Sequence, residues 1–166
     1  MSPPSNAREP LPRFVAPMLL QSGPPAQPVS GEWAIEVKFD GIRAQLRVDR
    51  SRGWSLRSRP GRDCTVQFPE LACLADALAA PRLILDGELV HLGADGRPNF
   101  TRLRRRLTPR DEAAAMRASG ECPATLIVFD VLHLDGVAVR ALAYEQRRAL
   151  LLGLVGEGPY WRLAPS

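Results

Sequence analysis

Lysine is almost absent from this chain of 166 residues: of its 22 basic residues, 21 are arginine, and the one lysine is Lys38. On a solvated surface the two side chains carry nearly the same charge, so a drift toward arginine is easily tolerated there. Lysine differs because its amine can lose the proton and act as a nucleophile. The one position that keeps lysine is therefore a candidate nucleophile, and chance survival is the alternative.

Other absences exclude whole classes of protein. No apolar run approaches the roughly 18 residues that suggest a membrane span, and the N-terminal segment lacks the apolar stretch of a signal peptide. We therefore expect a cytoplasmic protein with no membrane partner. Cys64, Cys73 and Cys122 fit neither a disulfide framework nor a zinc pair, and neither His91 nor His133 has a second ligand at metal-binding spacing. Reduced thiols and no zinc site are expected.

The composition is that of a globular protein preceded by a proline-rich segment. Hydrophobic residues make up 45% and charged residues 24%, which excludes the disordered and collagen-like classes. Residues 1–31 hold eight of the 16 prolines, and we interpret them as an extended leader in which residues 15–20 (VAPMLL) dock as a short apolar anchor. Residues 32–166 are predicted to form one domain.

Hydrophobic patterning predicts a mixture of strands and helices in that domain. Alternating or continuous apolar runs predict strands over residues 32–37, 43–49, 54–58, 83–92, 124–134 and 160–163. Helical spacing predicts helices over residues 68–80, 99–119 and 144–154. Because strands follow one another in hairpins rather than alternating strictly with helices, the pattern favours an α+β fold.

Lys38 lies in the segment with the densest chemistry, KFDGIR at residues 38–43. If a strand extends to Lys38, that residue and Glu36 project to one face, and Gly41 would let the chain turn so that Arg43 could clasp a phosphate. The alternative is an exposed strand end that carries weak salt bridges.

Four motifs in order resemble the ATP-dependent DNA ligases, which belong with RNA ligases and mRNA capping enzymes to the lysine nucleotidyltransferases. They are KFDGIR at 38–43, SRPGRD with FPEL between 58 and 71, LDGELV at 85–90, and FDVLHLDG at 129–136. PMLL, FTRLRRR and YEQRRALL are similar to segments of short bacterial ligases of repair and end joining. The resemblance implies an antiparallel-sheet nucleotidyltransferase fold, the ATP-grasp-like fold of the ligase adenylation domain, of which this chain would hold the N-terminal portion.

The resemblance also implies the chemistry. Lys38 would attack the α-phosphate of ATP, release pyrophosphate and form a lysine–AMP phosphoramidate, with Mg²⁺ neutralising the phosphates. The AMP would then pass to a 5′-phosphate in nicked double-stranded DNA during repair or recombination. Such an enzyme would be nucleoid-associated in a bacterial cytoplasm.

Five further residues have implied roles around the nucleotide. Glu36 would offer its backbone to adenine, and Phe129 would stack on the base. Arg43 and Arg59 would contact the ribose and phosphate or the DNA end. Glu88 would bind the ribose hydroxyls or the metal ion. The structural alternatives are a core position for Phe129 and a turn position for Glu88.

A cluster of arginines follows the third motif. Arg102, Arg104, Arg105 and Arg106 are expected to contact the DNA backbone, and Arg102 and Arg106 would share a helical face. A solvated helix face is the alternative.

The resemblance has a limit. Two downstream lysine-containing motifs and the oligonucleotide-binding domain of the family have no counterpart, because Lys38 is the only lysine, and EGPYWR at 157–162 is interpreted as a chance likeness. We therefore interpret residues 32–166 as a truncated adenylation domain and expect weak nick sealing from this chain alone. A complementary ligase fragment or end-joining proteins would be its partners. A non-catalytic remnant that binds ATP or DNA, and an RNA ligase or capping-type enzyme, are the alternative functions.

Overall fold

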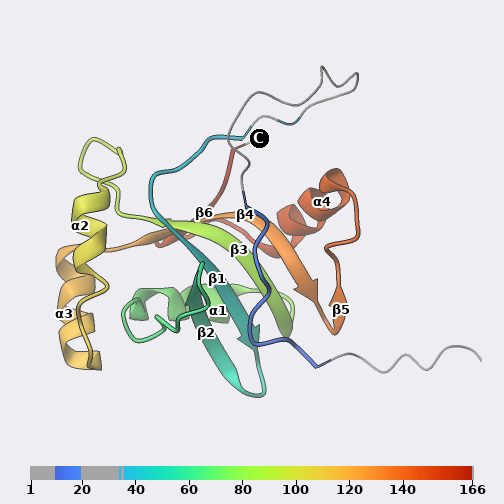
Figure 1. Ribbon diagram of the computed structural model, residues 1–166, viewed down its shortest axis with the longest axis horizontal. Coiled ribbons are helices and arrows are strands. Elements are labelled where there is room, and N and C mark those ends of the chain that lie inside the picture. The colour runs from blue at the N-terminus through green and yellow to red at the C-terminus, as the bar shows by residue number, and fades with distance from the viewer. Residues whose placement is uncertain (1–9, 20–33, 35, 166) are drawn as a thin grey trace, which may run out of the picture.

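A six-stranded sheet forms the centre of the computed structural model, which describes residues 10–19, 34 and 36–165 (Figure 1). The strands are β1 (Ile42–Asp49), β2 (Gly53–Ser58), β3 (Arg82–Val90), β4 (Thr125–Leu134), β5 (Val137–Ala138) and β6 (Trp161–Leu163). Their order is β2-β1-β3-β4-β5, and β6 also pairs with β4. The β4–β6 pair is parallel and the other pairs are antiparallel. The predicted α+β fold with an antiparallel sheet is confirmed.

The helices are short, and they differ from prediction where the chain breaks them. They are η1 (Pro69–Leu71), α1 (Ala72–Ala77), α2 (Phe100–Arg105), α3 (Glu112–Glu121) and α4 (Tyr144–Leu154). The bounds of α4 match the prediction, whereas the single helix predicted over 99–119 is two helices. Asn99 caps α2 and Asp111 caps α3, because each side chain accepts a hydrogen bond from a backbone N–H three residues on. None of the helices in the described part of the chain is long and apolar enough to cross a membrane.

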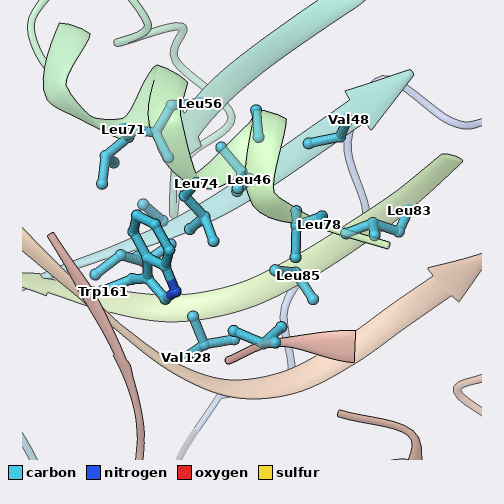
Figure 2. Close-up of a cluster of buried hydrophobic side chains, with 14 of the residues drawn as sticks. Leu46, Val48, Leu56, Leu71, Leu74, Leu78, Leu83, Leu85, Val128 and Trp161 are labelled. Atoms are coloured by element: carbon cyan, nitrogen blue, oxygen red, sulfur yellow. The ribbon is translucent and has the colours of Figure 1, made fainter. Parts of the chain in front are cut away.

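One face of the sheet carries the main hydrophobic core. Alternate residues of β1, such as Leu46 and Val48, point to this face, as do Leu83 and Leu85 of β3. Figure 2 shows these side chains in one cluster with Leu74 and Leu78, in which Leu46 lies beside Leu74, and with Trp161 of β6 and Val128 of β4. Burial of one strand face in this way leaves the opposite face free to carry polar side chains.

The N-terminal segment, residues 10–19, crosses that opposite face, as the blue trace in Figure 1 shows. Leu11 and Val15 are buried against Ile84 and other residues of the sheet. The side-chain amide of Gln45 holds the segment, since it accepts from the Val15 N–H at 3.1 Å and donates to the Val15 carbonyl at 2.6 Å. The predicted docking of residues 15–20 is confirmed at Val15 but wrong for Met18 and Leu19, whose side chains are 83% and 60% exposed; residue 20 lies outside the described residues.

The strand predicted over residues 32–37 is wrong for the part that the structure describes. Residues 36–40 have no strand pairing, and residues 32, 33 and 35 lie outside the described residues. Val37, an apolar position in the alternating pattern, is 57% exposed. Alternation alone does not make a strand, because the backbone N–H and C=O groups also need a neighbouring strand.

The structure gives a different reason for glycine at position 41 from the sharp turn expected from the sequence. A Cβ atom at this position would lie 2.1 Å from the Leu89 carbonyl oxygen, far inside van der Waals contact. Glycine is therefore needed because β3 passes directly beside the chain where β1 begins.

Candidate active site

A cavity of about 700 Å³ opens on the polar face of the sheet. This size is within the range of small-molecule sites in proteins. The six residues predicted to form the nucleotide site all line it: Glu36, Lys38, Arg43, Arg59, Glu88 and Phe129. Segments that lie far apart in the sequence are thus brought together around one space by the sheet.

Strand alternation explains how Arg43 and Glu88 reach the cavity. Ala44 and Leu89 point into the core, so their neighbours in β1 and β3 face the other way. Arg43 and Glu88 are directly opposite each other in the antiparallel β1–β3 ladder. The register therefore places a cation and a carboxylate side by side at the cavity wall.

Phe129 reaches the cavity through an irregularity in β4. Asp130 pairs with Asp86 and Val128 pairs with Gly87, so Phe129 is an extra residue with no opposing partner in β3. Such a bulge redirects side chains next to functional sites. Here it lets Phe129 and Asp130, which are consecutive, both line the cavity.

Protein groups already hold the guanidinium of Arg43. Nη2 and Nε donate to the two carboxylate oxygens of Asp86 at 3.0 and 3.3 Å, and Nη1 donates to the Met18 carbonyl at 2.6 Å. The guanidinium carbon lies 5.4 Å from the centre of the Phe129 ring. Arg43 thus connects three elements at one wall of the cavity and supports the ring expected to stack on a base.

Arg59 lies on a turn beside this wall. Its backbone N–H donates to the Arg43 carbonyl at 3.0 Å, and Gly61, with φ of 83°, closes the turn by donating to the Ser58 carbonyl at 2.7 Å. The Arg59 side chain is exposed at the rim. This placement leaves its charge available to a phosphate.

Glu88 is the cavity carboxylate with the most perturbed environment. Burial raises the pKa of Glu88 from 4.5 to about 7, although the charges of Arg43 and Lys38 oppose the shift. The Gly41 N–H also donates to this carboxylate. A group that titrates near neutral pH in a cavity is a candidate for a functional role.

The residues at the cavity fit a magnesium ion that is bound by one protein carboxylate and takes its other ligands from water and the substrate. Within residues 10–19, 34 and 36–165, no group of three or more His, Cys, Asp or Glu side chains could form a metal cage. Magnesium commonly uses one or two carboxylates, with water and substrate phosphates as its other ligands. Glu88 matches that pattern, whereas the carboxylate of Asp86 is occupied by Arg43.

The Glu88 pKa gives a testable pH dependence. Because the pKa is higher in the folded than in the unfolded chain, the folded state binds the extra proton. The stabilisation from this group should be complete below about pH 4.5 and disappear as the pH rises through about 7. Urea unfolding across this range should show the decline, and it should be weaker in Glu88→Gln but unchanged in the exposed control Glu112→Gln. A Glu88 carboxyl signal that titrates near 4.5 in carbon NMR would contradict the assignment.

Comparison with known proteins decides the family. A model described as "ATP dependent DNA ligase domain" matches residues 17–165. The chain belongs to this family.

Named relatives and a solved structure agree with that membership. This ligase domain is 39% identical over 137 residues to the "Multifunctional non-homologous end joining DNA repair protein LigD" of Mycobacterium tuberculosis, covering 82% of this chain and 16% of that protein. It is 38% identical over 149 residues to a "Probable DNA ligase" of Streptomyces avermitilis, covering 87% of this chain and 28% of that protein. The solved structure titled "mycobacterial DNA ligase D complexed with ATP and MES" is 33% identical and matches with a TM-score of 0.55 over 70% of this chain and 34% of that chain. The ligase domain therefore spans less than a third of these curated relatives.

Sequence reasoning missed part of the cavity wall contributed by α4. Tyr144 and Arg147 line the cavity, and so does Asp130 of β4. Arg147 binds both carboxylate oxygens of Asp130, at 2.8 and 3.1 Å. The YEQRR segment resembled the family, but nothing in its helical pattern showed which side chains would face the Lys38 segment.

The arginine cluster does not form a single surface. The side chains of Arg102, Arg104 and Arg105 are exposed on α2, whereas Arg106 is buried, with 1% of its surface exposed. The expected DNA contact of Arg106 is inconsistent with that burial, and the helical face predicted for Arg102 and Arg106 does not exist as a shared surface. Arg106 follows buried Leu103 by three residues, so it lies on the inner face of the helix.

Proposed function

We propose that this ligase domain forms a lysine–AMP intermediate at Lys38 and transfers the AMP to the 5′-phosphate of a DNA nick. One observation carries the proposal: the only lysine of the chain lines a nucleotide-sized cavity together with Arg43, Glu88 and Phe129. A cation, a carboxylate and an aromatic ring are the groups that a nucleoside triphosphate needs for its phosphates, its ribose or metal, and its base.

The reaction at Lys38 is a displacement at phosphorus. The neutral Nζ would form a bond to the α-phosphorus of ATP while the bond to the bridging oxygen breaks, and pyrophosphate would leave with that electron pair. The proton lost from the amine would go to solvent. Such transfers depend mainly on positioning and charge neutralisation, because the protein contributes little covalent chemistry beyond the nucleophile.

The remaining residues would bind and orient ATP. Phe129 would stack on adenine and the Glu36 backbone would meet the edge of the base. Arg59 would contact phosphate, while Arg43, already held by Asp86, would contribute charge and support the Phe129 ring. Glu88 would bind the ribose hydroxyls or Mg²⁺, which when bound would neutralise phosphate charge.

Incubation of the chain with α-labelled ATP and Mg²⁺ tests the proposal. The expected result is an acid-labile, labelled protein, because phosphoramidates hydrolyse in acid. The label should map to Lys38 in a peptide digest. Unlabelled protein in a preparation that binds ATP would support the alternative of a non-catalytic, nucleotide-binding domain.

The proposed DNA substrate is supported by the name of a longer relative. The printed name of the mycobacterial relative refers to non-homologous end joining, and we propose that this domain acts on nicked double-stranded DNA in that kind of repair, in the bacterial cytoplasm at the nucleoid. A complementary ligase segment or end-joining proteins would act with it.

We propose that Arg102, Arg104 and Arg105 contact the DNA backbone. Changing all three to Gln should reduce the slope of log affinity against log salt by up to about 2.7, since each lost phosphate contact contributes about 0.9. Fluorescence anisotropy with nicked duplex at several salt concentrations would measure the slope. The matched control changes three other exposed arginines, Arg52, Arg140 and Arg162, and removes the same net charge. Equal slopes for the two triple variants would contradict the proposal and show that the arginines of α2 form a solvated helix face without DNA contact.

A further inference from the structure

We propose that Tyr144 of α4 is a positioning residue for Lys38 and acts through the side chain of Glu36. The proposal rests on the proposed function, because it assigns a role in the lysine–AMP step. It concerns how the nucleophile is held in place.

Lys38 lies in a segment that pairs with no strand, although the side chain of the next residue, Phe39, packs against the cluster of Val90, Ile127 and Ala164. Residues 36–40 have no strand pairing, and the Lys38 side chain is exposed to the cavity. A segment without ladder hydrogen bonds samples more conformations than a strand does. Productive attack on phosphorus, however, requires the amine within a narrow range of positions, and a misplacement of about 1 Å can slow a reaction 100-fold.

Two hydrogen bonds from other parts of the fold flank Lys38. On the N-terminal side, the Tyr144 hydroxyl donates to Glu36 Oε1 at 2.8 Å. On the C-terminal side, the Gly41 N–H donates to the Glu88 carboxylate. The nucleophile is therefore held between a helix and a strand, two residues after one contact and three residues before the other.

Helix α4, which carries Tyr144, is anchored to the rest of the domain. Leu151 and Val155, at its C-terminal end, are buried in the main core. Near its N-terminus, Arg147 binds the carboxylate of Asp130 through two hydrogen bonds and donates to the Leu142 carbonyl at 2.7 Å. Tyr144 thus projects from a helix that is fixed at both ends to the rest of the domain.

The chemistry of the Tyr144–Glu36 contact suits a lasting hydrogen bond. Burial, together with the bond to Glu36, raises the pKa of the Tyr144 hydroxyl above its ordinary value of 10. The phenol therefore keeps its proton at neutral pH and remains a donor, while a carboxylate is a strong acceptor. Tyr144 and Glu36 both line the cavity, so their contact lies at the rim of the site.

The first test is the rate of a single turnover. In Tyr144→Phe, the maximum rate of lysine–AMP formation should fall roughly tenfold, while the ATP concentration for half-maximal rate changes less than about twofold. Loss of a residue that only stabilises the fold would lower the amount of labelled protein, because fewer molecules are folded, but would leave the rate constant of the folded molecules unchanged. The matched control is Tyr160→Phe, which removes a hydroxyl from the other tyrosine of the chain, outside the cavity. A Tyr144→Phe rate equal to that of the control would overturn the proposal.

A double variant tests whether the effect passes through Glu36. If Tyr144 acts through that carboxylate, Tyr144→Phe in a Glu36→Ala background should slow the step no further. Two effects that multiply would show that the residues act independently, and the proposal would fail.

A third measurement does not depend on activity. Because Lys38 is the only lysine, a chain labelled with ¹⁵N-lysine gives one backbone amide signal, and this signal reports directly on the proposed segment. In Tyr144→Phe its heteronuclear NOE should fall, indicating faster motion, whereas Tyr160→Phe should leave it unchanged. An unchanged NOE in Tyr144→Phe would overturn the inference, while absence of lysine–AMP in the wild-type chain would instead refute the proposed function.

Discussion

Replacing Lys38 with Arg should abolish the formation of labelled protein from α-labelled ATP. A guanidinium stays protonated under all protein conditions and cannot provide a free amine for attack on phosphorus. Losses of a nucleophile reach the order of 10⁴- to 10⁶-fold in enzymes, so label should fall to background. Lys38→Arg keeps the positive charge at the cavity, so the loss would report the nucleophile rather than electrostatics.

The single lysine makes an unusually clean control possible. A chain carrying both Lys38→Arg and Arg140→Lys contains one lysine again, at an exposed position that does not line the cavity. This variant should also remain unlabelled, because an amine elsewhere lacks the surrounding groups. Label retained in Lys38→Arg would show that another residue is the nucleophile and would contradict the assignment of Lys38.

Replacing Arg106 with Met should destabilise the fold by about 3–5 kcal/mol, the usual effect of removing one partner from a buried ion pair. Arg106 donates to both carboxylate oxygens of Glu70, at 2.6 and 3.0 Å, and to the carbonyls of Cys122 and Gln67 at 2.7 and 2.5 Å. Its guanidinium also lies 5.1 Å from the centre of the Phe68 ring. The substitution would leave the Glu70 carboxylate buried, with only the Ala124 N–H at 2.9 Å to bind it.

Urea unfolding at constant slope would measure the effect as a lower midpoint. Arg105→Met is the matched control, since the neighbouring side chain is exposed and should change stability by no more than about 0.5 kcal/mol. The double variant Arg106→Met with Glu70→Gln should lose less than the sum of the single losses, because neither charge remains unpaired. A loss below about 1 kcal/mol for Arg106→Met would contradict a structural role for this pair.

Sequence signals predicted most of the strands and six of the residues that line the cavity. The strands β1 to β4 begin and end within two residues of their predicted positions, since apolar alternation reflects which face is buried. The cavity residues followed from motif resemblance around the lone lysine. The strand predicted over 32–37 failed because strand pairing depends on partners distant in the sequence, whereas the missed break between α2 and α3 is marked by a local signal, the cap at Asp111.

The sequence by itself determined the candidate nucleophile and the α+β class, because both depend on residue type and local spacing. Only the tertiary structure decided which charges are free and which are structural. Arg106 and Arg105 are neighbours in one basic run, yet one is buried against Glu70 and the other faces solvent. Likewise, the bulge that directs Phe129 into the cavity and the contact from Tyr144 to Glu36 arise from the register and packing of distant segments. Side-chain spacing along one segment carries no information about the element packed against it, and that element determines the environment of each charge.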